Sequence, residues 1–173
     1  MEDKGFVHVY TGDGKGKTTA AFGLALRAAS AGERVYIGQF VKDMVYNECH
    51  LADLMPANVV IEQLGRGCFI QRNPERVDID LAHEGLNRCL DMMQSGAFDM
   101  VILDEVTIAI YYKLLNEDEV IDAITRRNKG VEIVVTGRYA PEKLMEISDL
   151  VTEMKEVKHY YQQGILSRNG IDH

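Results

Sequence analysis

The sequence contains no tryptophan, only three prolines and only three cysteines among its 173 residues. Cys49, Cys68 and Cys89 are odd in number and far apart, so they match neither a zinc-binding spacing nor a disulfide framework. No apolar run approaches the roughly 18 residues of a membrane span, and no charged and then apolar leader precedes the first apolar segment. These absences favour a cytoplasmic protein with free thiols and no membrane partner.

Clusters of basic residues are also absent, and the formal net charge is −8 at pH 7. A nucleic-acid-binding domain usually presents a basic face, so no nucleic acid is expected as a partner. Hydrophobic residues make up 46% of the chain and charged residues 27%. This composition suits one globular domain with a sizeable core, and we assign residues 1–173 to a single domain.

A glycine-rich segment near the start is the most informative stretch. TGDGKGKTT at 11–19 follows a short apolar strand at 6–10 and precedes an alanine-rich helix. Closely spaced glycines let backbone N–H groups turn toward an anion, and the N-terminus of the helix adds partial positive charge. Strand, glycine-rich turn and helix is the order of a phosphate-binding loop, or P-loop. The residues expected to contact phosphates or their metal ion are Gly12, Asp13, Gly14, Lys15, Gly16, Lys17, Thr18 and Thr19.

The register of this loop differs from the usual pattern, which has a glycine five positions before the glycine of GK[ST]. Thr11 occupies that position here, and the first glycine, Gly12, comes one residue later. We therefore expect the phosphates in a changed register. The alternative, a glycine-rich turn without a ligand, gives no reason for GKGKTT between a strand and a helix.

Apolar runs alternate with helical patterns along the rest of the chain. Such alternation implies an α/β fold with a mostly parallel central sheet, while one sequence does not determine the order of the strands. Strands are predicted at 6–10, 35–40, 59–64, 100–105, 131–135 and 150–154, and helices after the P-loop and at 75–95, 106–115, 118–127 and 141–147.

The run MVILDE at 100–105 carries the second chemical signal. A buried strand that ends in two carboxylates, Asp104 and Glu105, resembles a Walker B element, in which one carboxylate holds Mg²⁺ directly or through water. A glutamate in this position can also orient an attacking water. The alternative is that the two carboxylates cap the following helix.

Three further charged residues follow predicted strands. Loops at the carboxyl ends of parallel strands are where open α/β folds bind ligands. Lys42 and Glu48 follow the second strand and Arg138 follows the fifth, so all three are expected to face the ligand. For Lys42 and Glu48, a solvated charged loop is the alternative.

Beyond these motifs, the chain resembles a known family nearly end to end, the P-loop type of ATP:cob(I)alamin adenosyltransferase, also called ATP:corrinoid adenosyltransferase. The tail DLVTEMKEVKHYYQQGILSRNGID at 149–172 is the most family-specific part, and the family shares the late first glycine of the P-loop. The other matching segments are YTGDGKGKTTAAFGLALRAA at 10–29, QFVK at 39–42 with Asn47-Glu48, VILDE at 101–105 and VTGRYAP at 135–141.

This resemblance implies a homodimeric, three-layer, RecA-like α/β enzyme. It transfers the 5′-deoxyadenosyl group of ATP to the cobalt of a reduced corrinoid and releases triphosphate, in adenosylcobalamin synthesis or salvage. Mg²⁺ or Mn²⁺ would assist, and an electron-donating reductase or flavoprotein would be a partner. By position, the resemblance makes Lys17 and Glu105 catalytic, places the metal ion at Thr18, Asp104 and Glu105, and places Glu48 and Arg138 beside the nucleotide.

The chain departs from the family after the third strand, where members often carry Gly-Phe-x-Trp and the aromatic residues contact the corrinoid. The corresponding residues are Gly67-Cys68-Phe69-Ile70, so the tryptophan is missing and the phenylalanine comes one position later. Phe69 is the predicted corrinoid contact, and we expect a changed affinity for the corrinoid or a changed choice of corrinoid.

Two other functions are compatible with these residues. An ATP-hydrolysing or phosphoryl-transferring P-loop enzyme would use Glu105 to orient water and would release ADP. A nucleotide- or corrinoid-binding protein with little turnover would fit the loss of the aromatic residue. His159 has no partner that the sequence reveals.

Overall fold

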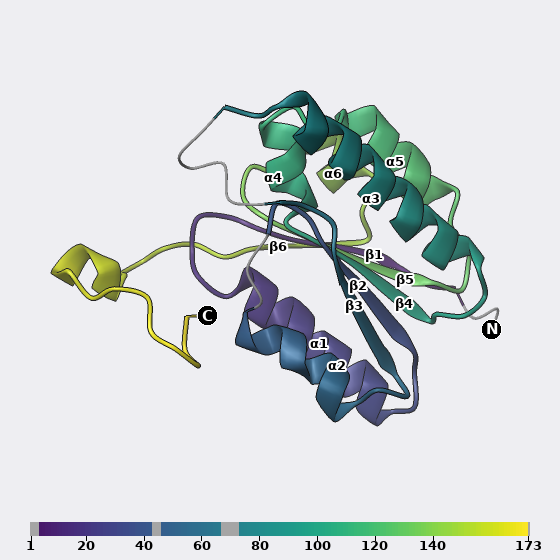
Figure 1. Cartoon of the computed structure of the whole chain (residues 1–173), viewed down its shortest axis with the longest axis horizontal. Helices are drawn as coiled ribbons and strands as arrows, with labels where there is room; N and C mark the ends of the chain where they lie inside the picture. Colours follow the sequence, from purple (N-terminus) through teal and green to yellow (C-terminus); the bar gives the residue numbers. More distant parts are fainter. Residues whose placement is uncertain (1–3, 43–45, 67–72, 173) are drawn as a thin grey trace.

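A computed structural model of the chain describes residues 4–42, 46–66 and 73–172. The strands in these residues form one six-stranded sheet in the order β3-β2-β4-β5-β1-β6 (Figure 1). Every pairing in it is parallel, so the predicted α/β fold is confirmed. The strands are β1 (Val7–Thr11), β2 (Val35–Gln39), β3 (Val59–Gln63), β4 (Met100–Asp104), β5 (Glu132–Thr136) and β6 (Leu150–Glu153).

Helices cover both faces of the sheet and make three layers (Figure 1). On one face lie α1 (Lys17–Ser30) and α2 (Leu51–Leu54), which follows the short 3₁₀ helix η1 (Asn47–His50). Because both faces of the central strands are covered, β2 and β4 are buried along their whole length and read as continuous apolar runs. The helices on the other face are α3 (Arg76–Gln94), α4 (Val106–Tyr111), α5 (Glu117–Thr125) and α6 (Glu142–Glu146).

The amphipathic pattern of α3 places its apolar side against the sheet. Leu86, Cys89 and Met93 recur at helical spacing, and all are buried in the core beside β2 and β4. Burying such a side chain stabilises the fold by about 1.5–3 kcal/mol. Cys89 and Met93 are therefore core residues, while Cys68 lies outside the described residues.

The loop between α4 and α5 differs from the sequence prediction, which continued the first helix to residue 115. The helix ends at Tyr111, because Lys113 adopts a left-handed conformation with φ 59° and the chain turns there. Asn116 then starts α5, since its side chain accepts a hydrogen bond from the Asp118 N–H at 2.9 Å. Helical turns were also not predicted in the polar segment that contains η1 and α2.

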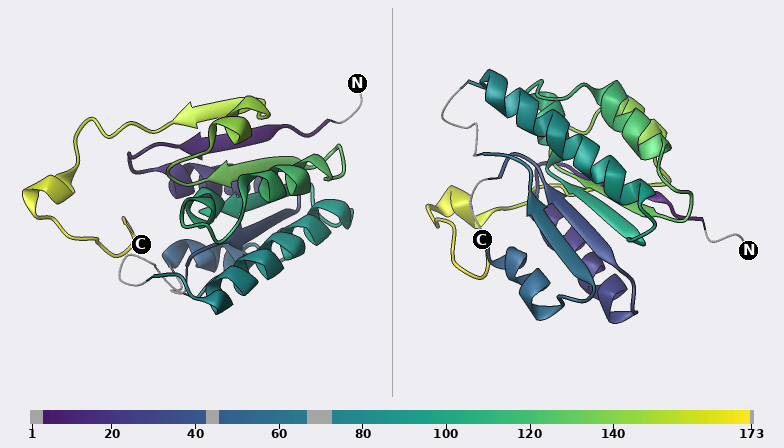
Figure 2. Two further views of the ribbon diagram at one scale, coloured as in Figure 1. Left: turned by 90° about the horizontal axis from the view of Figure 1, so that it is seen from above. Right: turned by 45° about the vertical axis from the view of Figure 1, so that its right-hand side comes forward.

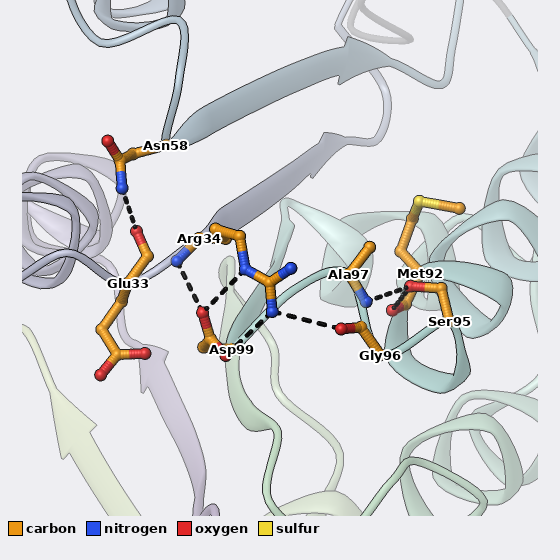
Figure 3. Close-up of polar contacts among 8 residues, drawn as sticks. All are labelled: Glu33, Arg34, Asn58, Met92, Ser95, Gly96, Ala97 and Asp99. Carbon is orange, nitrogen blue, oxygen red and sulfur yellow. Dashed lines mark hydrogen bonds and ion pairs between the residues drawn. The ribbon is translucent and has the colours of Figure 1, made fainter.

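The amino edge of the sheet is closed by polar contacts (Figure 3). The Arg34 N–H donates to the Asp99 carboxylate at 2.8 Å, and the Arg34 guanidinium donates to Asp99 and to the Gly96 carbonyl. The backbone N–H of Arg34, followed by its guanidinium, holds the pKa of Asp99 below its ordinary value. These contacts join the turn before β2 to the turn before β4. The polar residues predicted to bind ligands lie at the opposite, carboxyl edge of the sheet.

A C-terminal arm, residues 155–172, leaves β6 and extends beyond the carboxyl edge before it turns back (Figures 1 and 2). Its only helix among the described residues is the short 3₁₀ helix η3 (Tyr160–Gln163). No helix within the described part of the chain has both the length and the apolar character to cross a membrane.

Candidate functional site

A cleft of about 840 Å³ opens at the carboxyl edge of the sheet. The strands β1 and β4 lie on either side of β5, and the helices that follow them, α1 and α4, cover opposite faces. Such a divergence of connections leaves a crevice at the strand ends, the usual ligand site of open α/β sheets. The cleft is lined by the P-loop, the loops after β2, β4 and β5, and the C-terminal arm.

The P-loop needs its glycines. Gly12 and Gly16 have φ 99° and 120°, in the region that disfavours side chains. The Gly14 N–H donates to the Met154 carbonyl at 2.6 Å, and a Cβ at Gly14 would lie 2.7 Å from that oxygen. Thr11 completes β1, and its hydroxyl accepts a hydrogen bond from the Ala140 N–H at 3.3 Å. The first glycine of the loop, Gly12, therefore follows directly after the last residue of the strand.

Lys17 lies at the first residue of α1 and is folded over the loop. Its Nζ donates to the carbonyls of Gly12 and Gly14 at 2.7 and 2.8 Å, and the residue is only 7% exposed. Burial lowers the pKa of Lys17, and the nearby Glu105 carboxylate partly opposes this. A buried ammonium group that donates to carbonyl oxygens is suited to a multiply charged anion, to which it would form stronger hydrogen bonds.

Asp104 is fully buried at the end of β4 and accepts four hydrogen bonds. Its Oδ1 accepts from the hydroxyls of Thr136 at 2.7 Å and Thr18 at 3.0 Å. Its Oδ2 accepts from Lys42 Nζ at 2.7 Å and Gln39 Nε2 at 3.0 Å. Because these donors use both oxygens, Asp104 is suited to positioning Thr18 and Lys42 rather than to binding a metal ion directly.

The neighbouring Glu105 has a different environment. It adopts φ 62°, its N–H donates to the Thr136 hydroxyl at 3.0 Å, and it lines the cleft. Burial and then Asp104 raise the pKa of Glu105, while Lys42 and Lys17 oppose the shift. No side chain donates a hydrogen bond to the Glu105 carboxylate in the part of the chain that the structure describes, so this carboxylate is available to a ligand.

The donors at this edge fit Mg²⁺ or Mn²⁺ only together with a nucleotide. Among residues 4–42, 46–66 and 73–172, no three His, Cys, Asp or Glu side chains gather as a metal cage. Mg²⁺ usually takes one or two carboxylates, waters and substrate phosphates. The Thr18 hydroxyl and the Glu105 carboxylate meet this need, with Asp104 behind Thr18.

Lys42 and Glu48 both line the cleft and form an ion pair at 3.5 Å, which favours their facing the cleft over the alternative of a solvated loop. Burial opposes the charge on Lys42, but the carboxylates of Asp104, Glu48 and Glu105 together outweigh it and raise the Lys42 pKa. Arg138 also lines the cleft. The Thr107 hydroxyl fixes its backbone by donating to the Arg138 carbonyl at 2.6 Å.

Most of the other residues predicted to bind substrates line the cleft, but not all of them do. Asp13, Lys15 and Thr19 line the cleft together with the rest of the loop from Gly14 to Thr18. Gly12 does not line it, but its carbonyl holds Lys17. Phe69 lies outside the described residues.

The C-terminal arm supplies cleft residues that the motifs did not single out. Lys15 Nζ lies 2.9 Å from the Asp172 carboxylate and donates to the Ile171 carbonyl. Hydrogen bonding from Tyr160 and then Lys15 holds the pKa of Asp172 well below its ordinary value. Asn47 Nδ2 donates to Asn169 Oδ1 at 2.6 Å, so the arm is attached on two sides of the cleft. The NGID segment of the resemblance was the only sequence signal for these contacts.

His159, whose partner was not evident from the sequence, also lines the cleft. Its Nδ1 accepts a hydrogen bond from the Tyr161 N–H at 3.0 Å, which starts η3. The histidine therefore has a structural role in the arm.

Comparisons with known proteins agree with this geometry. The family model for ATP:corrinoid adenosyltransferase BtuR/CobO/CobP matches residues 3–173. A corrinoid adenosyltransferase of Escherichia coli (strain K12) is 34% identical over 174 residues, which cover 100% of this chain and 88% of the relative. Similar proteins of the same description occur in Salmonella typhimurium (34% identical, 100% and 88% covered) and Pseudomonas aeruginosa (31% identical, 99% and 85% covered). With this match over nearly its whole length, the chain belongs to the ATP:corrinoid adenosyltransferase family.

Proposed function

We propose that this protein transfers the 5′-deoxyadenosyl group of ATP to the cobalt of a reduced corrinoid and releases triphosphate. The observation that carries the proposal is a P-loop, with Lys17 held on its carbonyls, opening into a cleft of about 840 Å³ in a chain matched to the family over residues 3–173. Pockets of this size hold drug-sized ligands, so the cleft has room for a nucleotide and part of a second substrate.

The reaction breaks the bond between the 5′-carbon of ATP and its triphosphate oxygen, and forms a bond from that carbon to cobalt. The electron pair comes from the reduced cobalt, a strong nucleophile by virtue of the corrinoid's own chemistry. The tasks left to the protein are to align the 5′-carbon and to neutralise the departing triphosphate. Lys17 and Lys15 are placed for the second task.

We propose that Thr18 and Glu105 hold Mg²⁺ or Mn²⁺ against the phosphates, while Asp104 orients Thr18 and Lys42. The ion would supply positive charge to the leaving group. Glu48 and Arg138 are proposed to lie beside the nucleotide, because both line the cleft.

Four wider proposals accompany the reaction. The single continuous sheet supports one domain over residues 1–173. A homodimer is proposed because the edge strand β6 is exposed along its length, including Leu150 and Val151. Since the corrinoid must arrive reduced, an electron-donating reductase or flavoprotein is the proposed partner, and the cytoplasm, where ATP and reductants are both available, is the proposed location.

The test mixes the protein, ATP, Mg²⁺ and a chemically reduced corrinoid. Adenosylated corrinoid, followed by its visible spectrum, and triphosphate are expected in equal amounts, and ATP without corrinoid should remain largely intact. Formation of ADP and phosphate at a comparable rate without corrinoid would instead show that Glu105 serves attack by water. Binding of both substrates with neither product would identify a binding protein.

A further inference from the structure

Two tyrosines from different elements stack beside the cleft, and one of them, Tyr139, lines it. Tyr111 ends α4 and Tyr139 follows β5, and their ring centroids are 4.3 Å apart with an interplanar angle of 27°. Tyr112, which lines the cleft with Tyr139, packs edge-on against Tyr111 at 5.4 Å. Tyr111 and Tyr139 are 54% and 52% exposed, so these three residues form a partly open aromatic surface, here called the tyrosine wall.

The backbone that presents Tyr139 is strained and firmly held. Tyr139 has φ 59°, a left-handed conformation that is unfavourable for a residue with a bulky side chain. On one side, the Thr107 hydroxyl donates to the Arg138 carbonyl, and on the other, the Ala140 N–H donates to the Thr11 hydroxyl. Strain that is fixed in this way is characteristic of functional sites, and it keeps the ring in place before any ligand arrives.

The cleft and its rim have two chemically different parts, one positively charged and one aromatic. Lys15, Lys17 and Arg138 supply positive charge suited to a triphosphate, while the tyrosine wall supplies flat, largely uncharged faces. A corrinoid is much larger than ATP, so with ATP inside the cleft the macrocycle must extend over the rim. Half-exposed rings suit a large planar ligand that is only partly enclosed, because stacking needs one open face.

We propose that Tyr111 and Tyr139 form the rim contact for the corrinoid macrocycle and help to set corrinoid affinity in this tryptophan-free chain. The inference rests on the proposed function, because that function brings a corrinoid to the cleft. It assigns binding, with no role in the chemical step, to two residues outside the P-loop and Walker B motifs.

The experiment compares Tyr139→Asn, Tyr139→Phe and Tyr111→Ala. Asparagine tolerates a left-handed backbone, so Tyr139→Asn removes the ring without opposing the turn, and Tyr139→Phe keeps the ring. Phe6→Ala is the matched control, because Phe6 is 46% exposed just before β1, at the amino edge. Thermal unfolding of each variant checks that the fold is retained.

Two dissociation constants are measured. Cob(II)alamin is titrated in the presence of ATP and Mg²⁺ and followed by its visible spectrum, and ATP alone is measured by equilibrium dialysis. For Tyr139→Asn and Tyr111→Ala, the cob(II)alamin constant should rise about three- to tenfold, the range of one aromatic contact. The ATP constant should not change, and Tyr139→Phe and Phe6→Ala should bind both ligands like the wild type.

Weakened ATP binding with unchanged cob(II)alamin binding would assign the wall to adenine and overturn the inference. Unchanged constants for both ligands would overturn it as well. Failure of the proposed function has a different signature, since the wild-type protein would then form no adenosylated corrinoid.

Discussion

Lys17 is the buried cation nearest to the expected phosphates, and its replacement tests the P-loop directly. We expect Lys17→Ala to lower adenosyl transfer by about 10²–10³-fold, the typical loss when one donor to a developing charge is removed. The fold should survive, because the hydrogen bonds of Lys17 among the described residues go to carbonyls of its own loop. Initial rates and circular dichroism are the measurements.

Lys15→Ala is the matched control for this prediction. Its side chain is 39% exposed and already pairs with Asp172, so its removal should reduce the rate less than removal of Lys17. Wild-type turnover by a folded Lys17→Ala protein would remove the P-loop lysine from the mechanism.

Glu105 offers a test through pH, because its pKa is raised by burial and by Asp104. In the unfolded chain the carboxyl ionises near its ordinary pKa of about 4.3. The native state therefore binds more protons between this value and the raised pKa, and stability falls as pH rises through that window. At pH values above the window, the native state keeps the full destabilisation that comes from burying the ionised Glu105 carboxylate.

Glu105→Gln removes that cost. Its melting temperature should equal that of the wild type below pH ~4 and exceed it at neutral pH, while adenosyl transfer falls about 100-fold or more. Melting curves across this pH range are the measurement. A variant less stable than the wild type at neutral pH would contradict the prediction.

Some individual site residues could be predicted and others could not. The P-loop and the pair Asp104 and Glu105 follow from local sequence, because each motif lies on one strand end and its turn. The four-donor arrangement around Asp104 was not predictable, since Gln39 and Thr136 come from β2 and β5 and meet β4 only in the folded sheet order.

Among the elements, the C-terminal arm is attached to the P-loop by Asp172, which pairs with Lys15 and also accepts hydrogen bonds from Tyr160 and Arg168 within the arm. Asp172→Asn keeps the shape of the side chain but removes its charge. We expect trypsin to cut the arm at Lys158 about threefold faster or more, because a less firmly attached segment opens more often. Mass spectrometry of timed digests locates the cut.

Asp53→Asn is the control for the arm, because Asp53 is an exposed carboxylate on α2 that pairs only with His50 in the described residues. Its digestion should match that of the wild type. Equal cleavage of the arm in all three proteins would show that Asp172 does not hold it.

Strands and long helices were predicted within about one residue of their bounds, because burial between two helical layers makes each strand a continuous apolar run. The arm was left without structure in the sequence interpretation, because its contacts are polar and long-range and produce no periodicity. The short α4 was predicted too long, since the left-handed turn at Lys113 leaves no glycine as a signal.

For the whole molecule, the sheet order brings distant segments to one edge. β5 and β1 lie side by side between β4 and β6, so the Walker B strand, the Arg138 turn, the P-loop and the root of the arm follow one another across the sheet. At the opposite edge, Arg34 and Asp99 close the turns. The cleft and the Arg34–Asp99 contacts that stabilise the turns therefore lie at opposite ends of the strands.

The position of Asp172 within the cleft has a practical consequence for recombinant work. A purification tag joined after His173 would start two positions beyond Asp172, a carboxylate that contacts Lys15 in the P-loop. Linker residues there would compete with substrates for the cleft, and fusion partners could block it. The N-terminal side leads into the amino end of β1, whereas the cleft lies at the carboxyl edge of the sheet. Tags, surface attachment and fluorescent labels therefore belong at the N-terminus.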